Sequence, residues 1–254
     1  MKKLITLMLV LFSLGLSAQS VIEITYLDIH PTKIDRFVEL HKTIVDMSQG
    51  EERTVDGHWV YRHWYGSGGT IAIYDIFDSA EDVIKDDAFA VFSKNLDMLS
   101  EEKQKEVSKI FQEWWSFYDG HTDEMRVIDF EKDFSSKPDV NWDQPYVFVV
   151  GKYNSKNIQE MSQAYLDWQI FPGVNDGLVM GGGTSSHFKG SGHDLEVFQS
   201  YENIVAFANS ISGQSSDNPD ARSKFWDNVT GAHEDQIYIH VGHLVDGVFD
   251  LAGN

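Results

Sequence analysis

The sequence predicts an α+β protein in which one β-α-β-β-α-β unit occurs twice in tandem. One observation is an internal sequence repeat: the run from His63 to Gly68, HWYGSG, is similar to the run from His187 to Gly192, HFKGSG, 124 residues later. The other is the recurrence of residue types around it at the same offset, which places Ile34 on Ile158, Gly57 on Gly181, and Ile71 and Ile73 on Leu195 and Val197. Self-similarity at a fixed spacing indicates a duplicated structural unit.

The first copy opens with a strand and a helix. Residues 21–29 alternate apolar and polar side chains, which is typical of a strand with one buried face. Pro31 then suits the first turn of a helix, and apolar residues recur at helical spacing from Ile34 to Val45. The order at this point is β followed by α.

A hairpin and a second helix-strand pair complete this copy. Residues 59–65 and 70–77 are strand-like, and the intervening run GSGG contains the glycines that a tight turn needs for positive φ angles. Ser79 with Asp82 forms a capping box that opens a helix. A helical stripe at 107–114 and a closing strand at 125–130 follow.

The second copy repeats this order after a polar connector. The expected elements are a strand at 146–153, a helix at 158–168, hairpin strands around 190–192, helices near 204–208 and 225–229, and a strand at 237–241. We therefore expect a first ferredoxin-like unit at 19–130, a linker at 131–144 and a second ferredoxin-like unit at 145–254.

The first 18 residues have the pattern of a secretory signal peptide. Lys2 and Lys3 precede a short apolar run that ends in the small residues Ser17 and Ala18. We expect an exported protein, periplasmic or extracellular. Cleavage leaves 18 of the 20 basic residues against 40 acidic ones, a net charge of −22. Such a surface argues against nucleic acid and anionic lipid as partners.

The remaining bulk properties exclude further classes. No later segment is long and apolar enough to cross a bilayer, so we expect a soluble mature chain without membrane insertion. The sequence has no cysteine, which excludes thiol redox chemistry. No nucleophile elbow, HExxH zinc motif or phosphate loop is present, which leaves hydrolase and kinase functions without support.

The run from Tyr26 to Phe37, YLDIHPTKIDRF, resembles the strand-to-helix entry of the dimeric α+β barrel superfamily. That superfamily includes the antibiotic-biosynthesis monooxygenase, EthD-like and NIPSNAP-like families. The resemblance covers one corner of each copy and implies that the two units pair their sheets into an intramolecular barrel. It also implies a range of functions, from cofactor-independent oxygenation and haem handling to proteins with no known reaction. No residue roles are carried over from one family.

Aromatic residues on the second strand indicate a ligand site. Alternation places Trp59, Tyr61 and His63 on one face and Trp64 on the other. Aromatic rings with one or two polar groups are the usual lining of a small-molecule pocket. Trp59, Tyr61, Trp64 and, on the first strand, Tyr26 are therefore candidate ligand contacts, although ordinary core packing accounts for the same residues.

Two histidines are candidate catalytic groups. His63 and His187 end the second strand of each copy, where facing sheets bring equivalent positions toward a shared interior. An imidazole there can act as a base or bind haem, whereas a structural hydrogen bond within the hairpin is the alternative. We predict no metal site, because His240 and His243 are three residues apart and lie on opposite faces of a strand.

These observations favour an exported protein that binds a small apolar or aromatic ligand between two repeated units. One alternative is a cofactor-independent monooxygenase or haem-handling enzyme that uses His63 or His187. Another is a non-catalytic interaction module. The run Gly181–Gly183 lacks the dinucleotide fingerprint and instead predicts a bulge or a close approach by a ligand. The oligomeric state stays open.

Overall fold

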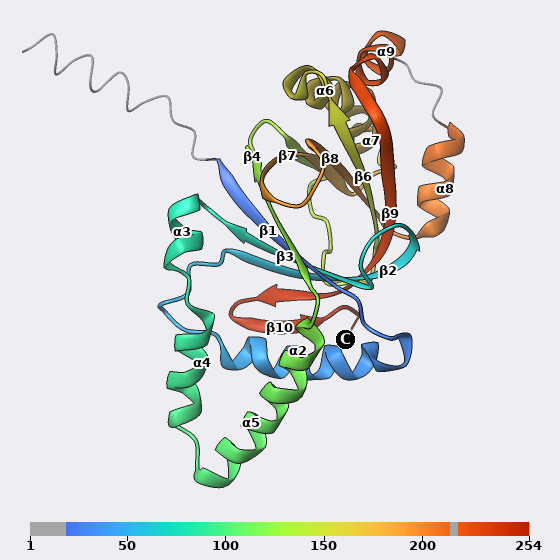
Figure 1. The fold of residues 1–254 in the computed structure, drawn as a ribbon. Helices are drawn as coiled ribbons and strands as arrows, with labels where there is room; N and C mark the ends of the chain where they lie inside the picture. Colours follow the sequence, from blue (N-terminus) through green and yellow to red (C-terminus); the bar gives the residue numbers. More distant parts are fainter. Residues whose placement is uncertain (1–18, 214–217, 254) are drawn as a thin grey trace, which may run out of the picture.

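The computed structural model describes residues 19–213 and 218–253, so the predicted signal peptide at 1–18 lies outside the described residues. Figure 1 shows the helices of the first half of the chain on one side of the strands and most helices of the second half on the other. Within the described ranges, no helix is long and apolar enough to cross a membrane.

The first unit has the predicted β-α-β-β-α-β order, with its second helix divided into three. Pro31 begins the short 3-10 turn that leads into the first helix, and the Ser79 hydroxyl accepts a hydrogen bond from the backbone of Asp82. The elements are β1 (Ser20–Leu27), η1 (Pro31–Lys33), α2 (Ile34–Met47), β2 (Gly57–Gly66), β3 (Ile71–Phe77), α3 (Ala80–Lys85), α4 (Ala88–Asp97), α5 (Glu101–Trp115), η2 (Ser116–Tyr118) and β4 (Thr122–Ile128).

The second unit repeats this order, with a π-helical turn in its first helix. A short strand precedes the unit and another ends it. The elements are β5 (Phe134–Ser136), β6 (Val147–Ser155), α6 (Ile158–Tyr165), η3 (Leu166–Ile170), α7 (Phe171–Asn175), β7 (Gly181–Gly190), β8 (Leu195–Tyr201), α8 (Ile204–Gly213), α9 (Pro219–Asn228), β9 (Val229–Val245) and β10 (Val248–Leu251).

Strands of the two units close into one barrel. In the described chain the order around the ring is β2-β3-β1-β4-β7-β8-β6-β9, and β9 pairs again with β2. Each unit contributes a ferredoxin-like sheet, and antiparallel pairing of β2 with β9 and of β4 with β7 forms the two seams. The predicted fold, two tandem ferredoxin-like units in an intramolecular dimeric α+β barrel, is therefore confirmed.

The two seams are built alike. Gly66 pairs with Gln236 in one seam, and Gly190 pairs with Glu124 in the other. A bulge follows His63 in β2, and β7 has its counterpart directly after His187. The shared register and this shared bulge, at the predicted offset, indicate a pseudo-twofold axis through the barrel.

Within the described ranges, the buried apolar side chains form three clusters. Alternation along each strand sends one set of side chains outward to the helices and the other set into the barrel. Leu27 and Phe37 belong to the core beneath the first unit's helices, and Leu195 and Phe225 to the equivalent core of the second. Ile24, Tyr61 and other inward-facing residues form the third core inside the barrel.

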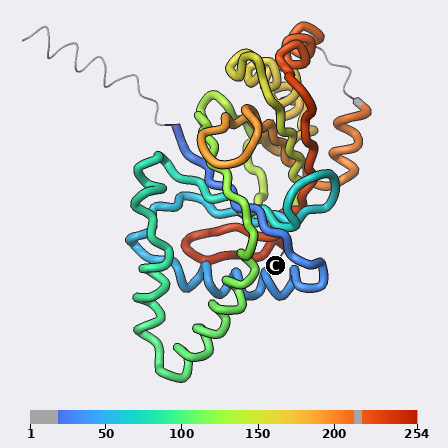
Figure 2. Tube along the Cα trace, viewed as in Figure 1, coloured from blue at the N-terminus to red at the C-terminus, as the bar shows by residue number. Residues whose placement is uncertain are grey.

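Two segments cross the boundary between the units. In the predicted linker, β5 pairs with Gly181–Gly183 of β7. A Cβ atom at Gly183 would lie 2.2 Å from the carbonyl oxygen of Asp133, so a close backbone approach requires glycine there. At the other end of the chain, β10 packs against α2 of the first unit, and Figure 2 shows the red C-terminal hairpin beside the blue helix.

Candidate functional site

An apolar cavity lies inside the barrel, and we call it the aromatic cavity. Its volume is about 370 Å³, which falls within the range of small-molecule pockets. Of its fifteen lining residues nine are aromatic, so flat hydrophobic surfaces dominate its walls. Trp59 and Tyr61 come from β2, Phe148 from β6 and Phe198 from β8, while Trp142 and Tyr146 come from the segment before β6.

Ring contacts hold one wall of the aromatic cavity in place. Tyr61 stacks on Phe148 with ring centroids 4.4 Å apart, and its hydroxyl hydrogen-bonds with that of Tyr146 at 2.9 Å. The Tyr146 ring in turn stacks on His240 at 4.5 Å. Interlocked rings have few alternative rotamers, so this wall is preorganised for a ligand.

The pseudo-twofold axis does not extend to the cavity walls. Gly183 and Ser185 of β7 occupy the positions that Trp59 and Tyr61 occupy in β2. One half of the barrel thus supplies large rings, and the other supplies small residues at equivalent places. Phe134 of β5, paired with Gly183, adds an aromatic ring to the lining.

A buried carboxylate forms part of the wall of the aromatic cavity. Glu196 of β8 is 0% exposed, and among the described residues neither of its carboxylate oxygens has a hydrogen-bond partner. The nearest cation is the Lys152 ammonium, 3.6 Å from Oε2. Burial raises the pKa of Glu196, although the charges of Lys152 and Arg126 act in the opposite direction.

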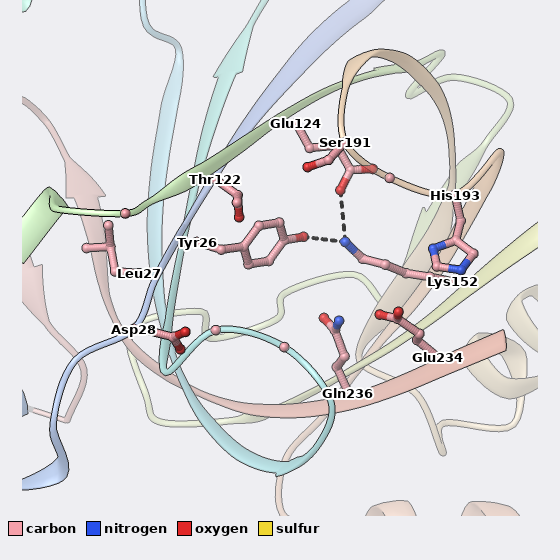
Figure 3. A pocket seen from close by; sticks show the side chains of 14 residues that line it. Tyr26, Leu27, Asp28, Thr122, Glu124, Lys152, Ser191, His193, Glu234 and Gln236 are labelled. Carbon is pink, nitrogen blue, oxygen red and sulfur yellow. Dashed lines mark hydrogen bonds and ion pairs between the residues drawn. The ribbon is translucent and has the colours of Figure 1, made fainter.

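Glu196 belongs to a buried charge cluster at the centre of the barrel. Lys152 donates to the Tyr26 hydroxyl at 2.6 Å and to Glu124 at 2.9 Å, as Figure 3 shows. Arg126, also fully buried, donates to the other oxygen of Glu124 and to the Ser185 hydroxyl at 2.8 Å. Two cations and two carboxylates balance each other's charge, which offsets the cost of burying them.

A second cavity, the polar cavity, lies on the other side of this cluster. Its volume is about 360 Å³, and the hairpin turns of both units contribute to its lining. Tyr26, Glu124 and Lys152 line it together with Gln236 (Figure 3). Glu196 lines one cavity and Lys152 the other, so this ion pair separates the two spaces.

The predicted ligand contacts divide between these places. Trp59 and Tyr61 line the aromatic cavity, and Tyr26 lines the polar cavity. Trp64 is 52% exposed and lines neither of the two cavities described above, because it points away from the face that carries Trp59 and Tyr61. The ligand contact proposed for Trp64 stays a prediction without support from the geometry.

The two predicted histidines occupy equivalent positions in β2 and β7. His63 lies edge-to-face with Tyr238 at 5.5 Å, and His187 pairs with Arg126 across the seam. In the described residues, Nε2 of each ring is buried without a hydrogen-bond partner, and neither ring lines the aromatic or the polar cavity. Neither His63 nor His187 is therefore placed to hold a haem in these cavities, and His193 is the one described histidine that lines the polar cavity. We derive no step through haem.

Sequence reasoning named Tyr26 but missed Glu196, Lys152 and the Glu124–Arg126 pair beside them. Glu196 and Lys152 stand in mostly apolar strands, and Glu196 lies two residues before Phe198 on the same face. A charged residue on a buried strand face was the available signal. The described residues contain no group of three or more His, Asp or Glu side chains that could hold a metal ion.

The fold and the cavity define this chain as a dimeric α+β barrel with an aromatic interior. No family model matches the sequence, and no curated protein matches it. Solved structures do match. An anthrone oxidase-like protein superposes with a TM-score of 0.58 and 13% identity over 93% of this chain and 97% of that one.

Two further similar structures are described as candidate monooxygenases. The protein from Fusobacterium nucleatum subsp. nucleatum has a TM-score of 0.60 and 12% identity over 93% of this chain and 99% of that one. The protein from Lactobacillus acidophilus has a TM-score of 0.54 and 7% identity over 92% and 97%. At these identities the likeness shows the shared fold alone.

Proposed function

We propose that this protein binds a small aromatic molecule in the aromatic cavity, after export from the cell. The observation that carries the proposal is a cavity of about 370 Å³ whose lining is mostly aromatic. A core built only for stability is packed without voids of this size, because each void forfeits dispersion contacts. Export is supported by the signal-like pattern of residues 1–18.

A second candidate function, oxygenation of the bound molecule without a cofactor, is favoured by Glu196. A buried carboxylate with a raised pKa beside an apolar cavity can accept a proton from a bound substrate. The similar solved structures described as anthrone oxidase-like or as candidate monooxygenases make this chemistry worth testing. Binding is the function that the geometry supports best.

The binding proposal predicts a difference between two tryptophans of one strand. We expect a neutral apolar dye, N-phenyl-1-naphthylamine, to bind saturably with increased fluorescence. Trp59→Ala should weaken binding about tenfold, because the ring is a wall of the cavity and its loss removes on the order of 1 kcal/mol of contact. Trp64→Ala is the matched control and should leave the dissociation constant unchanged, since Trp64 lies outside the cavity.

Circular dichroism of both variants checks that the fold is retained. If the dye does not bind the wild-type protein, or if both tryptophan variants bind it as the wild type does, the binding proposal is wrong and the interaction module gains support. Oxygen uptake by the protein together with a bound aromatic compound would favour the second candidate.

A further inference from the structure

The polar groups of the barrel centre differ in how fully they are hydrogen-bonded. One Glu124 oxygen accepts from Arg126 and the other accepts from Lys152. Lys152 also donates to Tyr26, and Arg126 also donates to Ser185. Within the part of the chain that the structure describes, Glu196 alone in this cluster has two carboxylate oxygens without a hydrogen bond.

A buried carboxylate has lone pairs for about four hydrogen bonds, and leaving them unused costs free energy. The Lys152 ion pair at 3.6 Å supplies charge compensation but no hydrogen bond of normal length. Glu196 is among the residues that line the aromatic cavity, and both of its oxygens lie just beneath the cavity surface. A hydrogen-bond donor on a bound molecule therefore reaches them from that side after a small movement of the side chain. The first unit has Ala72 at the equivalent position, so this polar group marks one side of the cavity only.

The surrounding charges select the kind of donor. A cationic amine placed at Glu196 would also lie near Lys152, and an anion would meet the carboxylate itself. A neutral hydroxyl avoids both repulsions and donates one hydrogen bond. The aromatic walls at Trp59, Phe148 and Phe198 favour a flat ring as the part of the ligand that carries this hydroxyl.

We propose that the ligand of the aromatic cavity is a phenol-like molecule whose hydroxyl donates a hydrogen bond to Glu196 while its ring packs against the aromatic walls. This inference rests on the proposed binding function and names its ligand class. It makes Glu196 the residue that distinguishes a hydroxylated ring from the same ring without the donor.

Two probes of nearly the same shape test this directly. 2-Naphthol carries the hydroxyl, and 2-methoxynaphthalene replaces its hydrogen by a methyl group. We expect the wild-type protein to bind 2-naphthol about tenfold more tightly, which is the effect of one hydrogen bond to a buried charged group. Displacement of N-phenyl-1-naphthylamine measures both dissociation constants at one pH.

Glu196→Gln should reduce this preference to about twofold or less, because the neutral amide is a weaker acceptor. The matched control is Glu202→Gln, which alters an exposed glutamate just past the end of β8 and should preserve the wild-type ratio. The wild-type comparison needs no variant, so it remains decisive even where Glu196→Gln does not fold.

The outcomes separate the two proposals. If neither naphthalene compound nor the dye binds, the binding function itself fails. If both compounds bind the wild-type protein equally well, or if Glu196→Gln retains the full preference, binding in the cavity stands and the assignment of Glu196 as the hydroxyl acceptor is overturned.

Discussion

At the residue scale, the first unit contains a series of hydrogen bonds whose donors and acceptors can be assigned in only one way. The indole N–H of Trp114 can only donate, and it donates to Nδ1 of His41 at 3.1 Å. The neutral His41 ring therefore carries its proton on Nε2 and donates to Nε2 of His58 at 2.9 Å. His58 then donates from Nδ1 to Asp75 at 2.6 Å. A second proton on His41 would remove one of these hydrogen bonds.

Buried histidines make stability depend on pH. Burial, reinforced by His58, lowers the pKa of His41 well below its ordinary value, and burial lowers the pKa of His240 to about 4. Below the pKa that it has in the unfolded chain, such a histidine takes up a proton on unfolding, which favours the unfolded state. Its contribution to the free energy of unfolding is therefore fully present above about pH 6.5 and is lost as the pH falls toward the folded-state pKa.

We expect His240→Gln to flatten the pH dependence of the unfolding free energy. Between about pH 6 and 4.5, the wild type should lose about 1 kcal/mol per pH unit more than the variant, because glutamine takes up no proton. Groups with raised pKa values, such as Glu196, act in the opposite sense in both proteins and cancel in the difference. Urea unfolding at several pH values measures this difference in unfolding free energy.

The control for this comparison is His30→Gln, which alters an exposed histidine of the first unit. It should leave the wild-type slope unchanged. Equal slopes for the wild type and His240→Gln would contradict the assignment of a neutral, buried imidazole at position 240.

At the element scale, the C-terminal hairpin belongs structurally to the first unit. Phe249 of β10 is 0% exposed and sits in the core under α2, edge-to-face with His41 and His58. Its backbone N–H donates to Asp46 at 2.8 Å, and its carbonyl accepts from Lys42. Four residues at the end of the second copy thus complete the core of the first.

We expect Phe249→Ala to lower the free energy of unfolding by about 3 to 5 kcal/mol, which is usual for removal of a fully buried ring. Val248→Ala is the matched control, because the neighbouring side chain is 47% exposed and should change stability by less than about 0.5 kcal/mol. Denaturant unfolding gives both values. A small effect at Phe249 would show that β10 contributes little to the first unit's core.

At the scale of the whole molecule, the two units are connected by both barrel seams and by the terminal hairpin. The long strand β9 pairs with β2 on one side and with β6 on the other, so loss of β9 would remove both pairings and open the ring. Barrel closure leaves no free edge between the units. This connectivity implies that the units unfold together.

We therefore expect a core mutation in one unit to destabilise the other. Phe225→Ala removes a fully buried ring from the second unit's helix core and should reduce the hydrogen-exchange protection of α2 as much as that of α6. Native-state hydrogen exchange resolves the two helices separately. Protection lost in α6 alone would show that the units are independent and that the seams transmit little stability.

Local patterns predicted much of the fold and part of the candidate site. Alternation along β2 put Trp59 and Tyr61 on one face and Trp64 on the other, and the cavity lies on the first of these faces. The repeat offset anticipated the equal seams at His63 and His187. These features depend on neighbouring residues, whose side-chain directions follow from strand geometry.

By itself, the sequence determined that the unit is duplicated, the order of the main elements in each copy and which residues of β2 share a face. Only the tertiary structure decided that Tyr26, Lys152 and Glu196 meet, because they come from three strands that barrel closure brings together around the pseudo-twofold axis. It also placed Phe249 under α2. Pairings between residues a hundred or more positions apart depend on the global packing of the chain, which no short-range pattern encodes.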